Sequence, residues 1–152
     1  MNSWKVGRIL VAVDGSENAT QAAKVAITLA EKFGAELIIC HAIQPPFYSF
    51  TQDGLAVPAD VLKYYITAAH DEAKAMVDTL VQLAEASHVK AESAIQENTL
   101  SVVETIVNLA ASRSVDLIVI GTRGRTGFKK LLMGSVSSGV MNHAHCPVLV
   151  VR

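Results

Sequence analysis

Apolar residues are distributed along this chain in two alternating patterns. Short runs that are almost wholly apolar predict β-strands, at residues 8–13, 36–42, 89–95, 116–120 and 147–151. Between these runs, apolar residues recur every three or four positions, which predicts helices that begin near residues 16, 59, 101 and 135. The alternation predicts an α/β fold: a single domain over 1–152, with an open, doubly wound parallel sheet of five strands and helices on both faces.

The predicted helices carry capping signals at their ends. Ser16 or Asn18 is suited to cap the first helix, and Gly34 is suited to end it. The segment Ser101-Val-Val-Glu104 has the spacing of a capping box. These signals fix the helix ends more firmly than periodicity alone.

The longest predicted helix spans residues 59–87. Its apolar positions, from Val61 to Leu83, form one face that is suited to packing on a sheet. We therefore expect Tyr64 and Tyr65, which lie on this helix, to contribute to core packing.

Ligands of doubly wound sheets bind beyond the carboxyl ends of the strands, where the strand order reverses. Asp14 ends the first predicted strand, and Gly121 ends the fourth. If these two strands are neighbours, their loops share one crevice, although the local pattern leaves that adjacency open. Asp14-Gly15-Ser16 also fits ordinary turn and helix-cap chemistry, so the carboxylate has a structural interpretation beside the functional one.

The segment from Gly121 to Ser137 has the spacing G-x2-G-x9-G-S-x-S, with glycines at 121, 124 and 134. Glycines let several backbone N–H groups point into one space and let an anion approach closely. Ser135 and Ser137 lie where a helix is predicted to begin, and a helix start attracts anions. The segment is neither a Walker A loop nor a G-x-G-x-x-G loop. We interpret it as a phosphate or nucleotide site; the alternative is an ordinary connection rich in turn glycines.

Charge is concentrated in the same segment. The chain carries 13 Lys and Arg against 14 Asp and Glu, a net charge of −1, which argues against a general nucleic-acid or acidic-membrane binder. However, no acidic residue occurs between Thr122 and Ser138, and the segment contains a basic group of Arg123, Arg125, Lys129 and Lys130. The basic residues therefore lie where bound phosphates would need them.

The remaining composition bears on location. No apolar run approaches the roughly 18 residues of a membrane span. The first residues lack the pattern of a signal peptide, and the two cysteines, Cys40 and Cys146, do not make a disulfide framework. We expect a cytoplasmic protein with no membrane partner.

The short sequence His143-Ala-His145-Cys146 could suggest a metal site. It lacks a fourth ligand at a typical spacing, so a helix end that leads into a strand is the preferred interpretation. We therefore expect no metal site built from side chains here.

Three blocks together resemble the universal stress protein family: Ile9-Leu-Val-Ala-Val-Asp14-Gly15-Ser16, the Gly121–Ser137 pattern, and Cys146-Pro-Val-Leu-Val-Val151. They occur in family order, and the resemblance covers nearly the whole chain. It implies a Rossmann-like sheet of order 3-2-1-4-5, cytoplasmic homodimers, and the ATP-binding branch of the family, of which the glycine pattern is the marker.

The resemblance also implies which residues would contact ATP. Asp14 would lie near the adenine or ribose, and backbone groups around His41 and Ala42 would contact the adenine edge. Mg²⁺ would bind the phosphates, with Asp14 as an additional ligand in one arrangement. The residues expected to surround the ribose and phosphates are Gly121, Arg123, Gly124, Gly134, Ser135, Val136 and Ser137.

We expect an ATP-binding stress-response regulator or sensor. The alternatives are a slow ATPase or nucleotidyl-transfer enzyme, and an interaction module without nucleotide. No catalytic residue is assigned, because residues 122–138 contain no Asp, Glu or His to act as a base, so hydrolysis should be slow at most. The last strand, Val148 to Val151, is expected at a sheet edge, where unpaired backbone would allow a homodimer to form.

Overall fold

The computed structural model describes residues 3–44, 57–97, 99–123 and 133–152. Strands and helices alternate along the chain as the pattern predicted. The strands are β1 (Arg8–Ala12), β2 (Glu36–Ala42), β3 (Ala91–Gln96), β4 (Leu117–Gly121) and β5 (Val148–Val151). The helices are α1 (Glu17–Phe33), α2 (Ala59–Ala86), α3 (Val102–Ser112) and α4 (Ser135–His143).

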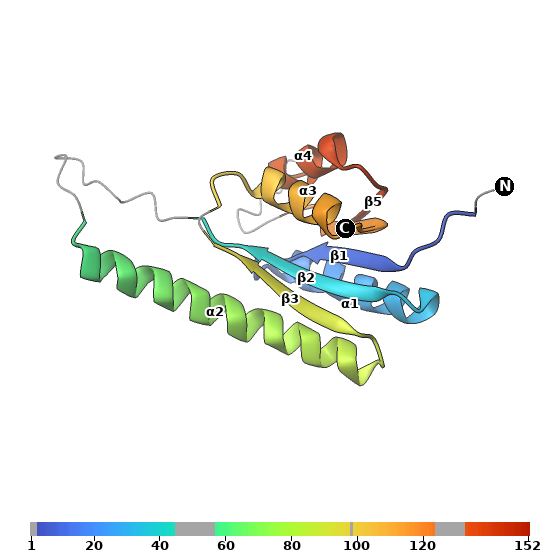
Figure 1. Ribbon diagram of the computed structural model, residues 1–152, viewed down its shortest axis with the longest axis horizontal. Coiled ribbons are helices and arrows are strands. Elements are labelled where there is room, and N and C mark those ends of the chain that lie inside the picture. The colour runs from blue at the N-terminus through green and yellow to red at the C-terminus, as the bar shows by residue number, and fades with distance from the viewer. Residues whose placement is uncertain (1–2, 45–56, 98, 124–132) are drawn as a thin grey trace.

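The strands form one parallel sheet of order β3-β2-β1-β4-β5, which confirms the predicted order (Figure 1). In the centre of the sheet, Leu10 of β1 lies opposite Ile38 of β2 on one side and Ile118 of β4 on the other. Strand order therefore reverses between β1 and β4. The carboxyl end of β1, just before Asp14, therefore lies beside the carboxyl end of β4 at Gly121. This adjacency is the one that a shared crevice requires.

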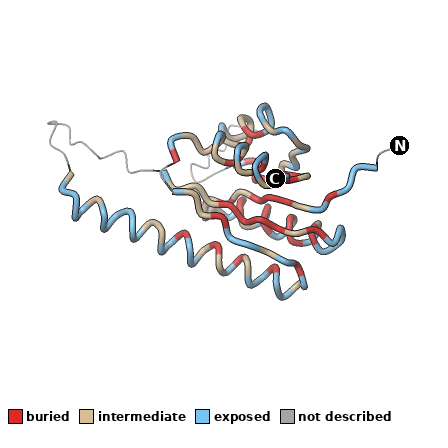
Figure 2. The backbone as a smooth tube through the Cα atoms, in the orientation of Figure 1, coloured by how far each residue is buried: buried red, intermediate tan, exposed pale blue. Residues whose placement is uncertain are grey.

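The sheet separates two apolar cores. Alternate residues of the central strands point to opposite faces: Val11 packs with the core beneath α1 and α2, while Leu10 packs with the core beneath α3 and α4. Both residues are fully buried, and each such side chain contributes about 1.5–3 kcal/mol of hydrophobic stabilisation. In Figure 2 the buried residues are concentrated in the central strands and in α1.

The expected capping residues hold the helix ends. Ser16 caps α1, where its hydroxyl accepts the N–H of Ala19 at 3.1 Å. Gly34 ends α1 in the left-handed conformation at φ 65°, which glycine adopts at little cost. Ser101 caps α3 by accepting the N–H of Glu104 at 3.2 Å. Of the two residues proposed to cap α1, Ser16 is the cap, and Asn18 has a different role.

The expectation for the tyrosines of α2 is wrong. Tyr64 and Tyr65 are 74% and 60% exposed, whereas Val77, Leu80 and Ala84 in the second half of the helix are buried. Figure 1 shows the reason: the second half of α2 runs along β3, and the first half extends beyond the end of the sheet. Helical spacing predicted the apolar face but not the length of sheet that covers it.

No helix in the described parts of the chain is long and apolar enough to cross a membrane. The Pro- and aromatic-rich segment 45–56 lies outside the described residues.

Candidate functional site

A cleft of about 700 Å³ opens at the carboxyl edge of the sheet, above the point where strand order reverses. The ends of β1, β2 and β4 form its floor. Helices α2 and α3 and the start of α4 form its walls. The fold thus places a cavity of ligand size where doubly wound sheets bind their ligands.

The cleft brings together almost every residue predicted to bind nucleotide. Gly124 lies outside the described residues, as do the basic residues Arg125, Lys129 and Lys130. All the other predicted residues line the cleft: Asp14, His41, Ala42, Gly121, Arg123, Gly134, Ser135, Val136 and Ser137.

Asp14 is held at the cleft by a turn. Its Oδ1 atom accepts the N–H of Ser16 at 2.9 Å, and Gly15 between them has φ 85°, a conformation that favours glycine. Ser16 in turn caps α1. The structural interpretation of this segment is therefore correct, and the carboxylate is nevertheless part of the cleft lining.

Thr122 joins both ends of the glycine-rich segment to the sheet. Its N–H donates to the carbonyl of Val151 in β5 at 2.9 Å. Its carbonyl accepts the N–H of Gly134 at 2.6 Å and the hydroxyl of Ser137 at 3.1 Å. The start of α4 is thereby fixed against the end of β4, with Thr122 itself buried.

The two serines of the motif have different surroundings. Ser137 is only 2% exposed, and its hydroxyl donates to the carbonyls of Thr122 and Gly134. Ser135 is exposed at the mouth of the cleft. The hydroxyl of Ser137 thus bonds to the protein backbone, whereas Ser135 is an exposed residue of the cleft lining.

The amino end of α4 is suited to an anion. Its N-cap is Gly134, with φ −72° and ψ 163°, and Gly134 has no side chain to accept the N–H groups of the first turn. Such N–H groups, together with the positive end of the helix dipole, attract negative charge. Ser135, Val136 and Ser137, which supply these groups, all line the cleft.

His41 is fixed at the end of β2. Its Nδ1 atom lies 2.7 Å from the carbonyl oxygen of Val13. Because a carbonyl only accepts, Nδ1 carries the proton and donates it. The N–H of Val13 donates to the carbonyl of Cys40 at 2.8 Å, so β1 and β2 are held together up to the cleft.

Apolar side chains complete the cleft, and several were not predicted as site residues. Cys40 lies in the floor, where burial raises the pKa of its thiol to about 12 and keeps it neutral. Ala69, Ala73 and Met76 line the cleft from α2; their spacing of one helical turn was visible in the sequence but indicated only a core-facing stripe. The other apolar lining residues outside the predicted set are Ala12, Val13, Ala19, Ile43, Val102, Ile106 and Ile120.

Glu72 of α2 also lines the cleft and was not predicted to do so. With Asp14, it forms the acidic part of the lining among the described residues. No local motif marks Glu72; it reaches the cleft only because α2 packs along β3 and β2.

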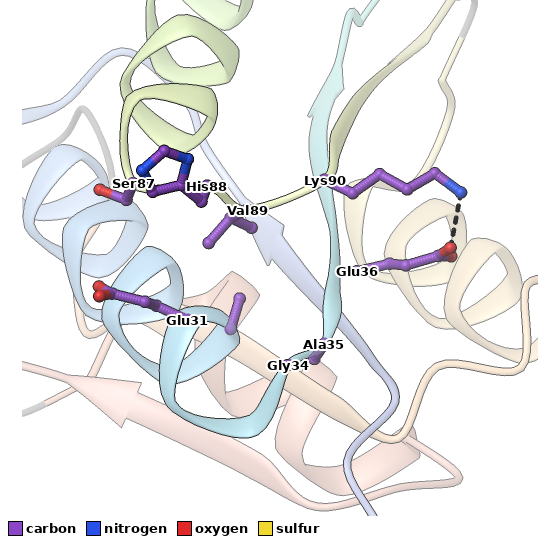
Figure 3. A pocket seen from close by; sticks show the side chains of 9 residues that line it. Glu31, Gly34, Ala35, Glu36, Ser87, His88, Val89 and Lys90 are labelled. Atoms are coloured by element: carbon purple, nitrogen blue, oxygen red, sulfur yellow. Dashed lines mark hydrogen bonds and ion pairs between the residues drawn. The ribbon is translucent and has the colours of Figure 1, made fainter.

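A second, smaller pocket of about 410 Å³ lies at the opposite edge of the sheet (Figure 3). It lies where α1 and α2 end, and none of the predicted site residues lines it. Glu36 on its border pairs with Lys90 at 2.7 Å and with Arg8 at 3.1 Å. The hydrogen bond from Lys90, and then that from Arg8, hold the pKa of Glu36 below its ordinary value of 4.5. These ion pairs link Glu36 of β2 to Arg8 of β1 and to Lys90, which precedes β3. We therefore interpret their role at this edge of the sheet as structural.

The histidines near the C-terminus form hydrogen bonds with backbone carbonyls. Nδ1 of His143 lies 2.8 Å from the carbonyl of Gly139, and Nε2 of His145 lies 3.1 Å from that of Val115. Within the described ranges, no three His, Cys, Asp or Glu side chains gather as metal ligands would. The structure thus favours the interpretation of His143–Cys146 as a helix end leading into a strand.

Known proteins share both the sequence and the architecture of this chain. The model of the universal stress protein family matches residues 5–152. A universal stress protein of Methanocaldococcus jannaschii is 33% identical over 95% of this chain and 81% of its own length. The universal stress protein YxiE of Bacillus subtilis is 34% identical over 95% of this chain and 98% of its own.

Solved structures agree with these sequence relatives. UspA of Lactobacillus plantarum, at 28% identity, superposes with a TM-score of 0.85 over 99% of this chain and 100% of its own. A universal stress protein in complex with cAMP, at 24% identity, has a TM-score of 0.67 over 97% of both chains. One from Archaeoglobus fulgidus in complex with dAMP, at 20% identity, has a TM-score of 0.68 over 99% and 100%. The match of the family model to nearly the whole chain, with the shared sheet order, shows that this chain belongs to the universal stress protein family.

Proposed function

We propose that this protein binds ATP with Mg²⁺ in the cleft and acts as a stress-response regulator whose state depends on the bound nucleotide. One observation carries the proposal: the amino end of α4, which has a glycine N-cap, and the carboxylate of Asp14 line the same cleft. The first suits phosphates, and the second suits a hydroxyl or amino donor or a metal ion.

The chemistry of the lining supports a nucleotide over a simple anion. Besides the helix terminus, the cleft has an apolar lining that includes Cys40 and Ile120 of the floor and Ile106 of α3, which suits a flat base. Its volume of about 700 Å³ is that of a small-molecule site. The family members with bound cAMP and dAMP support an adenine nucleotide as the class of ligand.

Each group of residues has a role in this proposal. The N–H groups of Ser135, Val136 and Ser137 and the hydroxyl of Ser135 would hold phosphate oxygens. The glycines at 121 and 134 would allow the chain to approach them, and Arg123 would neutralise charge. Asp14 would accept from the ribose or the adenine amino group, and backbone groups at His41 and Ala42 would contact the adenine edge.

Mg²⁺ fits the donor set of the cleft. Protein-bound Mg²⁺ takes one or two carboxylates together with phosphate oxygens and water, and Asp14 and Glu72 are carboxylates that line the cleft. The ion would neutralise phosphate charge beside these acidic residues. In this proposal Mg²⁺ helps to bind the nucleotide and takes no part in a reaction.

Binding rather than turnover is proposed because the segment that would hold the phosphates, residues 122–138, contains no acidic residue or histidine to activate water. A phosphate-release assay on the purified protein tests this part. We expect turnover far below about 1 s⁻¹, the lower end of ordinary enzymes, and a faster rate would favour the ATPase alternative.

The binding proposal is tested by calorimetric titration of the whole protein with Mg·ATP, comparing wild type with Asp14→Asn. The amide keeps an oxygen for the N–H of Ser16, so the turn survives while the charge is lost. We expect affinity to fall roughly tenfold, the effect of losing a charge-assisted hydrogen bond.

The matched control is Asp78→Asn, because Asp78 pairs with Lys74 on the surface of α2 and does not line the cleft. Its affinity should equal that of wild type. Equal affinities for wild type and Asp14→Asn would remove Asp14 from the site. Absence of ATP binding by wild type would favour the nucleotide-free interaction module.

We also propose that the protein forms a homodimer through β5. This strand lies at the edge of the sheet, paired only with β4 among the described strands. Its exposed Leu149 and the free side of its backbone offer a surface on which a second copy could pair.

A further inference from the structure

Asn18 does not line the cleft, but it lies beside it and contacts Gly121 at the end of β4. It is half-buried in the first turn of α1, next to Ala19, which lines the cleft. Its Oδ1 atom accepts the backbone N–H of Arg123 at 2.9 Å. Its Nδ2 group donates to the carbonyl of Val151 in β5 across a longer 3.5 Å. One amide therefore joins α1 to Arg123, two residues beyond the end of β4, and to the end of β5.

The same side chain gives a packing reason for glycine at residue 121. A Cβ atom at Gly121 would lie 2.3 Å from Oδ1 of Asn18 and 3.2 Å from its backbone oxygen. The first distance is far inside van der Waals contact. A side chain at residue 121 would therefore displace the amide of Asn18, which favours glycine here independently of any close approach by phosphate.

We propose that Asn18 is a positioning residue for the nucleotide site, acting through Arg123 and Gly121. This inference rests on the proposed function. Asn18 does not line the cleft; it sets the direction in which the chain leaves β4 and enters the glycine-rich segment. The backbone of Arg123 is thereby placed at the lip of the cleft before any nucleotide binds.

An asparagine is suited to this role because it presents an acceptor and a donor on one short, planar group. Arg123 requires the acceptor and Val151 the donor. The bond to Arg123 lies in an exposed environment, so water can replace it if Asn18 is removed. Loss of Asn18 should therefore disturb the position of Arg123 more than it disturbs the stability of the protein.

The test compares wild type, Asn18→Ala and Asn18→Asp by titration with ATP and with adenosine, the second ligand having no phosphate. We expect Asn18→Ala to lower the affinity for ATP about fivefold, the effect of losing one hydrogen bond. The affinity for adenosine should change by less than about twofold. Asn18→Asp keeps the acceptor for Arg123 and should bind ATP within about twofold of wild type.

Each contrary result has a distinct meaning. Unchanged ATP affinity in Asn18→Ala, or equal weakening by alanine and aspartate, would overturn the positioning role. An equal loss of affinity for ATP and for adenosine would show a general structural effect and would also overturn the positioning role. Failure of wild type to bind ATP would overturn the proposed function itself and, with it, this role.

A second measurement tests the contact between Asn18 and Gly121. Gly121→Ala should lower the midpoint of thermal unfolding in wild type, and by clearly less in the Asn18→Ala background, because the close Oδ1 contact is absent there. If Gly121→Ala alone does not fold, folding of the double variant gives the same support. Equal losses in both backgrounds, or failure of both to fold, would contradict the contact as the reason for glycine.

Discussion

At the scale of single residues, buried hydroxyl and backbone groups hold the end of β4 and the start of α4 together at the cleft. Ser137 donates to two carbonyls, and one of them, that of Thr122, also accepts the N–H of Gly134. Removing the Ser137 hydroxyl deletes a buried hydrogen bond, which costs free energy of folding even though both carbonyls keep a backbone N–H donor. Ser135 has no such function, because its side chain is exposed.

This difference predicts opposite effects of two alanine substitutions. Ser137→Ala should lower the free energy of unfolding by about 1–2 kcal/mol and the melting temperature by several degrees, for the loss of a buried hydrogen bond. Ser135→Ala should leave the melting temperature unchanged and lower the affinity for ATP instead. Thermal unfolding and titration of both variants check this, and a stable Ser137→Ala protein would contradict the assigned role.

Glu36 predicts a dependence of stability on pH. Its pKa is lowered in the folded state by the hydrogen bonds from Lys90 and Arg8, so the folded protein holds its proton less tightly than the unfolded chain does. The stabilisation is present above the ordinary pKa of 4.5 and is lost as the pH falls below it through the lowered folded value. The melting temperature of Glu36→Gln should therefore approach that of wild type in acid. A difference that stays constant from neutral pH into acid would contradict this.

At the scale of elements, α4 is short and depends on its packing. Gly139 in its middle lies so close to α3 that a Cβ atom there would be 2.7 Å from Cγ2 of Val103. Glycine weakens an isolated helix, so its presence here is explained by the close approach of the two helices. That approach, with the hydrogen bonds that the Thr122 carbonyl accepts from Gly134 and Ser137, sets where the amino end of α4 lies.

Gly139→Ala should therefore destabilise the protein by about 1–3 kcal/mol through overpacking, despite the better helix propensity of alanine. Adding Val103→Ala removes the atoms that would clash and should recover most of the loss. Chemical denaturation of the single and double variants measures both effects. A Gly139→Ala protein as stable as wild type would show that α3 can move away freely.

At the scale of the whole molecule, local patterns predicted the elements well and the long-range contacts poorly. Strand runs and the Ser16 and Ser101 caps are local signals that correspond to observed features, and Gly121 and Gly134 of the glycine motif line the cleft. The sheet order came from family resemblance, because periodicity does not specify which strands pair. Glu72 in the cleft and the contact of Asn18 with Gly121 depend on packing between distant segments, which no local pattern encodes.

The proposed dimer is also a property of the whole molecule. Val150 packs partly against the core beneath α3 and α4, whereas Leu149 is 38% exposed on the edge strand. Leu149→Lys should therefore place charge at the proposed interface with little effect on the fold, and should shift the molecular mass measured by light scattering from dimer to monomer. An unchanged mass with an unchanged melting temperature would place any interface elsewhere.

The most direct test of the central claim is calorimetric titration of the whole wild-type protein with Mg·ATP. We expect saturable binding of one nucleotide per chain, weakened by Asp14→Asn and unaffected by Asp78→Asn. No binding by the folded protein at concentrations up to about 1 mM, where even an interaction of about −4 kcal/mol is detectable, would contradict the assignment of the cleft as an ATP site.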